Sequence, residues 1–213
     1  MICNLGSLRS FSFAAFMIVL VTVNLGAQTQ SPIDGVDARA DASQIAKQLG
    51  SSDPNVRQRS AEALARLAAA DQKKLIEGYY LQEKNKEVRL ALDWALYRVG
   101  KSEALFRLVE ELDSGRQKQA IGYLSELESP DLLYLFLKKH NNRPRVNAGL
   151  LKALTRIGNA ESLEIIRPYL ESLQPYVAEA AEVATDEINR RLGEGEPAET
   201  RTRPRTAAKP NDY

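Results

Sequence analysis

Few residues of this chain have the type and spacing that enzyme chemistry requires. Cys3 is the only cysteine, and it precedes an apolar segment that we expect to be removed, which would leave no thiol for a disulfide, a zinc site or a nucleophile. His140, the only histidine, stands where a helix end is expected, which favours a capping or solvent-exposed role. The sequence contains no glycine-rich phosphate loop, nucleophile elbow or metal-spaced ligand set. We therefore expect no catalysis, no cofactor and no metal.

A set of recurring arginines is the remaining candidate for chemistry, because a basic strip could bind phosphate groups. Its members are Arg57, Arg66, Arg89, Arg98 and Arg156. Glu62 and Glu126 interrupt the strip, and arginine stems also cover apolar surface while their heads pair with nearby carboxylates. Lys and Arg total 29 against 28 for Asp and Glu, so net charge favours no nucleic-acid partner. The structural interpretation is the stronger one.

The N-terminus has the order of features found in a secretory signal. Arg9 supplies a positive charge, residues 11–23 are an uncharged run, and Gly26 and Ala27 supply a small-residue site. The run is shorter than the roughly 20 residues that a membrane span needs. We therefore predict a signal peptide over 1–27 and export to the periplasm or the extracellular space, with no stable membrane span after cleavage. Leu25 is larger than ideal at a cleavage site, so an uncleaved anchor is the alternative.

A pattern of apolar residues recurs about every thirty residues. With Leu64 as anchor, the equivalent positions are Leu96, Leu124, Leu154 and Thr185, at steps of 32, 28, 30 and 31. In the second copy the apolar residues are Val88, Leu92, Ala95, Leu96 and Val99. That spacing places one apolar stripe on an α-helix.

A second, shorter apolar helix is expected to follow each stripe, over 75–81, 104–112, 132–137 and 163–170. Pro54, Pro144 and Pro175 precede stripes in a position that a first helical turn tolerates, and Gly100 and Gly158 follow them. One helical pair cannot cover its own apolar face, but stacked pairs form a continuous core. We predict an all-α fold, a right-handed α-solenoid of about five hairpins over 41–192. A flexible linker over 28–40 and a disordered tail over 193–213 complete the predicted domains.

The repeats resemble bacterial HEAT repeats of the short, phycobilisome-lyase-like type. The resemblance lies in Val-Arg at 56–57 and 88–89, in the Ala-Leu pairs, and in Arg-Val-Gly at 98–100 with Arg-Ile-Gly at 156–158. The third copy departs from the pattern, with Arg116 at its leading apolar position and Glu-Ser-Pro at 128–130 in place of the closing glycine. That copy is expected to pack loosely or to change the curvature.

Four residues of the second copy are candidates for binding a partner. Leu90, Trp94 and Tyr97 form another stripe on a face that is polar or small in the other copies, and Arg98 lies beside them. An aromatic patch on a surface is typical of a protein interface. Alternatively, curvature of the superhelix lets these rings lie against the next copy, where Gly122 leaves room beside Tyr123.

Two hypotheses for function follow. The leading one is an exported scaffold that binds a protein or peptide partner and has no catalytic activity, because family membership implies a binding habit and no particular partner. The alternative, implied by the resemblance, is a phycobilin lyase or another small-molecule-handling enzyme. Those lyases act on intracellular chromoproteins, whereas this chain is expected to be exported without a cysteine.

The first testable prediction concerns the mature N-terminus. Because the apolar run is short and ends at small residues, the protein in the envelope fraction should begin near Gln28. N-terminal sequencing checks this. Recovery of intact Met1 from a membrane pellet would establish an uncleaved anchor in its place.

Overall fold

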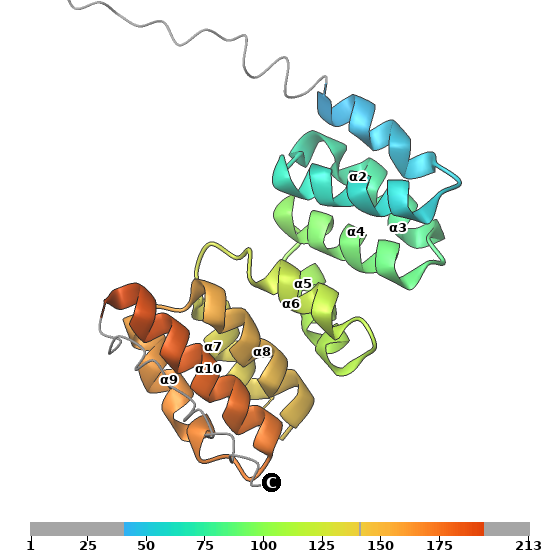
Figure 1. Cartoon of the computed structure of the whole chain (residues 1–213). Coiled ribbons are helices and arrows are strands. Elements are labelled where there is room, and N and C mark those ends of the chain that lie inside the picture. Colours follow the sequence, from blue (N-terminus) through green and yellow to red (C-terminus); the bar gives the residue numbers. More distant parts are fainter. Residues whose placement is uncertain (1–40, 141, 194–213) are drawn as a thin grey trace, which may run out of the picture.

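The computed structural model describes residues 41–140 and 142–193, and these residues form an array of helices without a β-strand (Figure 1). The predicted signal peptide, the linker and almost all of the predicted tail lie outside the described residues. The all-α solenoid that the repeat spacing predicts is confirmed.

Each repeat is a hairpin of two helices. We call the helices that carry the recurring apolar pattern the stripe helices and the others the linking helices. The stripe helices are α2 (Pro54–Arg66), α4 (Lys86–Arg98), α6 (Gln117–Leu124), α8 (Pro144–Ile157) and α10 (Pro175–Leu192). The linking helices are the helix at 41–47, α3 (Lys73–Gln82), α5 (Glu103–Glu110), α7 (Asp131–Lys139) and α9 (Ala160–Leu170). Short 3₁₀ turns at Gln48–Gly50, Ala70–Gln72 and Glu111–Asp113 extend three of the connections. In this part of the chain the hairpins number five, as expected.

The ends of the helices follow from local chemistry. Pro54 begins α2, where the missing N–H of proline costs nothing, and the Asp53 side chain accepts a hydrogen bond from the Asn55 N–H. The Asn85 side chain caps α4 in the same way. Gly100 has φ 92°, a left-handed conformation that stops α4 and that glycine adopts at little cost. His140 is the C-cap of α7, which agrees with its predicted place at a helix end.

The core runs continuously through the stack. Val88, Leu92, Ala95, Leu96 and Val99 are all buried, as the stripe requires. The pairs α2–α4 and α8–α10 pack extensively against each other. Because each stripe helix buries its apolar face on the next hairpin, the array is held together mainly by contacts between neighbouring repeats.

The third repeat differs from the others, as its sequence predicts. Helix α6 has 8 residues, against 13 in α2 and α4 and 14 in α8. Arg116 precedes α6 as its N-cap residue and pairs with Glu111 on the preceding turn, in place of the apolar contact made in other repeats. Helix α6 also packs less extensively on its neighbours. In Figure 1 the first four repeat helices and α7–α10 form two stacks, with α5 and α6 between them.

Gly158 closes α8 by a different mechanism from Gly100. Its φ is −62°, which any residue adopts, so conformational freedom does not explain the glycine. A Cβ at this position would lie 2.5 Å from Ile188 Cδ1 on α10 and 2.6 Å from the Leu154 carbonyl oxygen. The glycine is therefore needed for the close approach of α10.

This contact generates the second prediction. Gly158→Ala should lower the free energy of unfolding by about 1–3 kcal/mol, because Ile188 or the chain must move. Gly122→Ala is the matched control, since a Cβ there meets nothing within 4 Å, and it should raise stability by about 0.5–1 kcal/mol. Urea denaturation measures both. Equal effects of the two substitutions would contradict the proposed role of Gly158.

Candidate interaction surface

An aromatic cluster joins the second and third repeats. The ring of Trp94 on α4 stacks on Tyr97 at 5.6 Å between centroids and on Tyr123 of α6 at 5.8 Å. The Arg98 guanidinium lies 5.6 Å from the centroid of the Trp94 ring. Only 2% of Trp94 is exposed. The cluster is thus held between helices.

A hydrogen-bond network covers the cluster from the first repeat. The Tyr123 hydroxyl donates to Glu62 Oε1 at 2.7 Å, and the Gln58 amide donates to the same oxygen at 3.0 Å. The Gln119 amide donates to the Tyr123 hydroxyl at 2.8 Å. Burial raises the pKa of this hydroxyl well above its usual range, which keeps it neutral as a donor. Side chains of α2 and α6 therefore meet directly, although α4 lies between the two helices in sequence.

The exposed aromatic patch predicted from the second copy is wrong for two of its four residues. Leu90 and Trp94 are both 2% exposed. For Trp94 the physical reason is the curvature between the second and third repeats, which brings the Tyr123 ring against Trp94. Leu90 lines another pocket, together with Asp93 and Arg107.

Tyr97 and Arg98, the other two predicted residues, reach the surface at a pocket of about 440 Å³. Tyr97 is partly buried, and burial raises the pKa of its hydroxyl. The pocket lies where the stripe helices of the first three repeats end. Its lining residues are Ala68, Tyr97, Arg98, Gly100, Ser102, Leu127, Glu128, Ser129 and Leu132. Whether Tyr97 and Arg98 bind a partner stays a prediction.

Three of the lining residues occupy the same place in successive repeats. Gly100 stands 32 residues after Ala68, and Glu128 stands 28 residues after Gly100, which are the steps of the repeat itself. Ala68 has φ 46°, a left-handed conformation that is costly for a residue other than glycine. The pocket thus follows the row of turns that close the stripe helices. Glu128 and Ser129, from the Glu-Ser-Pro departure at 128–130, line its third side.

The recurring arginines divide into two groups. Arg57 forms a bidentate pair with Glu83, with its Nε 2.7 Å from Oε2, and Arg89 lies 4.8 Å from the centre of the Tyr80 ring. These two have the structural role that was expected. Arg66 and Arg156 are exposed, and neither side chain has a hydrogen bond or an ion pair with a described residue. Arg98 makes one loose contact with Glu128, at 3.6 Å.

The second pocket has a volume of about 350 Å³ and contains a buried ion pair. Arg107 Nε donates to Asp93 Oδ1 at 2.5 Å, and Asp93 is 5% exposed. Burial raises the pKa of Asp93 to about 6, and the pairing with Arg107 partly offsets that effect. The guanidinium groups of Arg89 and Arg107 lie 4.8 and 5.0 Å from the centre of the Tyr80 ring. These contacts join α3, α4 and α5, so the cluster is explained by packing between repeats.

Residues 41–140 and 142–193 contain no cluster of three or more potential metal-ligating side chains. Over the same part of the chain, no helix has the length and apolar character to cross a membrane.

A match to a family model supports the fold. Residues 42–121 match the family model described as HEAT repeats, which supports a HEAT-repeat protein built as a helical solenoid. No curated protein matches the chain. A solved structure titled as an engineered protein from a structural genomics consortium shares 21% identity, with a TM-score of 0.35, and the match covers 78% of this chain and 86% of that one.

The third prediction follows from the buried cluster. Trp94→Ala should lower the free energy of unfolding by about 3–5 kcal/mol, because it leaves a cavity between α4 and α6. Tyr97→Ala should cost about 1–2 kcal/mol, since that ring is partly exposed. Chemical denaturation followed by circular dichroism measures both. A Trp94→Ala protein as stable as the wild type would mean that the ring is exposed after all.

Proposed function

We propose that this protein is an exported, non-catalytic HEAT-repeat scaffold that binds a protein partner at the pocket formed by Tyr97, Arg98 and the turns of the first three repeats. We call this surface the turn pocket. Export rests on the charge, apolar run and small residues of the N-terminus. The partner would be met in the periplasm or outside the cell.

One observation carries the choice of site. The turn pocket is built from three repeats at once, and it combines the aromatic ring of Tyr97 and the partly exposed Leu132 with the charged groups of Arg98 and Glu128. A concave surface with apolar walls and a few charged groups is typical of sites that bind ligands and partner side chains. The titratable groups there are an arginine, an exposed carboxylate and a tyrosine. Burial raises the pKa of the tyrosine hydroxyl, which disfavours its ionised form, so this hydroxyl is not an activated base or nucleophile.

The fourth prediction tests the site by filling it. Ser102→Trp should block the turn pocket, because Ser102 lines it, is exposed and makes no side-chain cap hydrogen bond. The measurement is affinity capture from the envelope fraction of the native cell, with partners quantified by mass spectrometry. The wild type should capture a partner. The amount of that partner captured by the Ser102→Trp protein should be at least about tenfold lower.

Ser52→Trp is the matched control, because Ser52 is also an exposed serine but precedes α2, at the opposite edge of the array. It should capture the partner as the wild type does. Equal capture by all three proteins would place the binding site elsewhere. Failure of the wild type to retain any partner would contradict the scaffold function itself.

A further inference from the structure

We infer that the edge around the turn pocket selects an extended peptide segment in which acidic side chains flank an apolar one. This inference rests on the proposed function and adds the chemistry of the partner. It depends on Arg66, Arg98 and Arg156, which occupy equivalent places in the first, second and fourth repeats.

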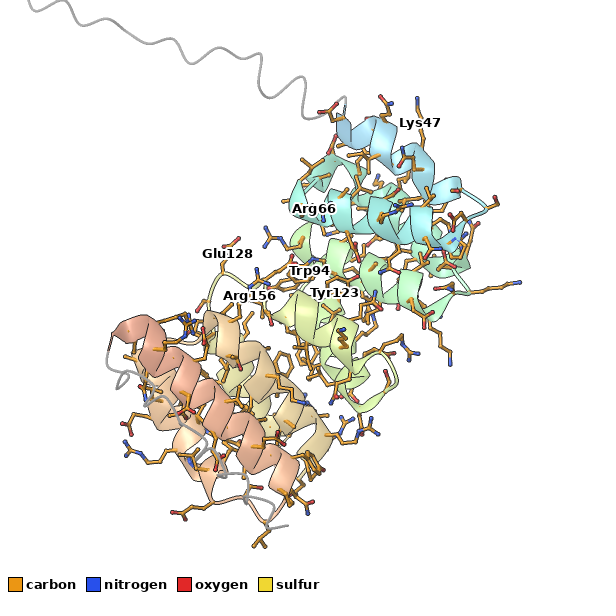
Figure 2. The ribbon with its side chains drawn as sticks, in the orientation of Figure 1. Lys47, Arg66, Trp94, Tyr123, Glu128 and Arg156 are labelled. Carbon is orange, nitrogen blue, oxygen red and sulfur yellow. The ribbon has the colours of Figure 1, made fainter. Side chains whose placement is uncertain are left out.

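The three arginines lie at one edge because the stripe helices run in the same direction. Arg66 and Arg98 are the last residues of α2 and α4, and Arg156 is in the last turn of α8. Figure 2 shows Arg66, Glu128 and Arg156 along this edge, with Trp94 and Tyr123 further inside. Each arginine stands two residues before a member of the row of turns, at positions 68, 100 and 158. In the third repeat the exposed Glu126 occupies the equivalent position, so the row is interrupted there and its positive charges lie on either side of that carboxylate, in the first two repeats and in the fourth.

These guanidinium groups are available to a ligand. Many other arginines of the described chain form ion pairs, as Arg57 does with Glu83 and Arg143 with Glu110, both at 2.7 Å. Arg66 and Arg156 have no such partner among the described residues, and the Glu128 carboxylate near Arg98 is 87% exposed. A guanidinium on a rim binds carboxylates in bidentate geometry, and pairing there requires little desolvation. An acidic ligand would thus find the donors of Arg66 and Arg156, which make no hydrogen bond or ion pair with a described residue, and Arg98, which also lies over the Trp94 ring.

The turn pocket distinguishes a peptide from a nucleic acid. Leu127, Leu132 and Tyr97 supply an apolar floor between the charges, and 37% of Leu132 is exposed. Such a floor suits an aliphatic or aromatic side chain and offers little to a phosphodiester backbone. Glu128 would also repel a continuous row of phosphates, whereas a peptide can place a neutral residue opposite it.

The repeat spacing sets the length of the segment. Adjacent packed helices lie about 8–10 Å apart, and an extended chain advances about 3.3 Å per residue. One repeat therefore corresponds to about three residues of ligand. A segment that reaches from Arg66 past the turn pocket to Arg156 needs about ten residues, with its apolar side chain near the middle.

The test is selection of random ten-residue peptides displayed on phage against the whole protein, followed by fluorescence anisotropy on labelled copies of the selected peptides. Asp and Glu should be enriched around a central apolar residue. Arg66→Gln with Arg156→Gln should weaken binding of a selected peptide by about threefold to tenfold, which is the effect of removing two rim charges. Raising the salt concentration should weaken binding as well.

The matched control is Lys138→Gln with Arg167→Gln, which removes two positive charges from the last turns of α7 and α9, at the opposite edge. It should leave binding unchanged. The selected peptides could lack acidic enrichment and still fail to bind the Ser102→Trp protein. That result would overturn this inference and leave the proposed function standing. Peptides that bind the Ser102→Trp protein as tightly as the wild type would count against both. If a twelve-nucleotide deoxythymidine strand binds more tightly than any selected peptide, the ligand of this edge is a phosphate backbone and the inference of an acidic peptide is wrong.

Discussion

Each helical hairpin of this protein carries an apolar stripe that it cannot cover by itself, and the rest of the structure depends on covering it. The stripe of α4 is buried only because α2 lies on one side and α5 and α6 on the other. The same requirement explains Gly158, whose missing side chain lets α10 approach α8. Stacking of repeats is thus the source of both the core and the shape.

The chemically interesting surface lies where the repeat is least regular. In the third copy a charged residue, Arg116, leads the helix, α6 is short, and Glu128 stands where the second and fourth copies have glycine. The loss of regular packing there leaves a pocket between the turns of three repeats. Proteins commonly depart from regular packing and local sequence preferences at their functional sites. A binding site at the irregular third repeat agrees with that tendency.

The sequence predicted the helices well because their signals are local. Apolar spacing, proline at the first turn and glycine after the last turn act within a few residues, so the stripe of Val88 and the position of Pro144 could be read directly. The candidate site was predicted only in part. Tyr97 and Arg98 reach a pocket, but Trp94 is buried by Tyr123, and that contact depends on the curvature between two repeats. No spacing within one helix encodes such an angle, although the irregular third copy marked where it would occur.

The hydrogen bond from Tyr123 to Glu62 has a consequence for how the array responds to stress. In an ideal solenoid each repeat feels only its nearest neighbours, so one end can fray while the remainder persists. Here the first and third repeats hold each other directly across the second. Opening either one costs the other this contact, which couples their local unfolding. We therefore expect the first three repeats to open together as one unit.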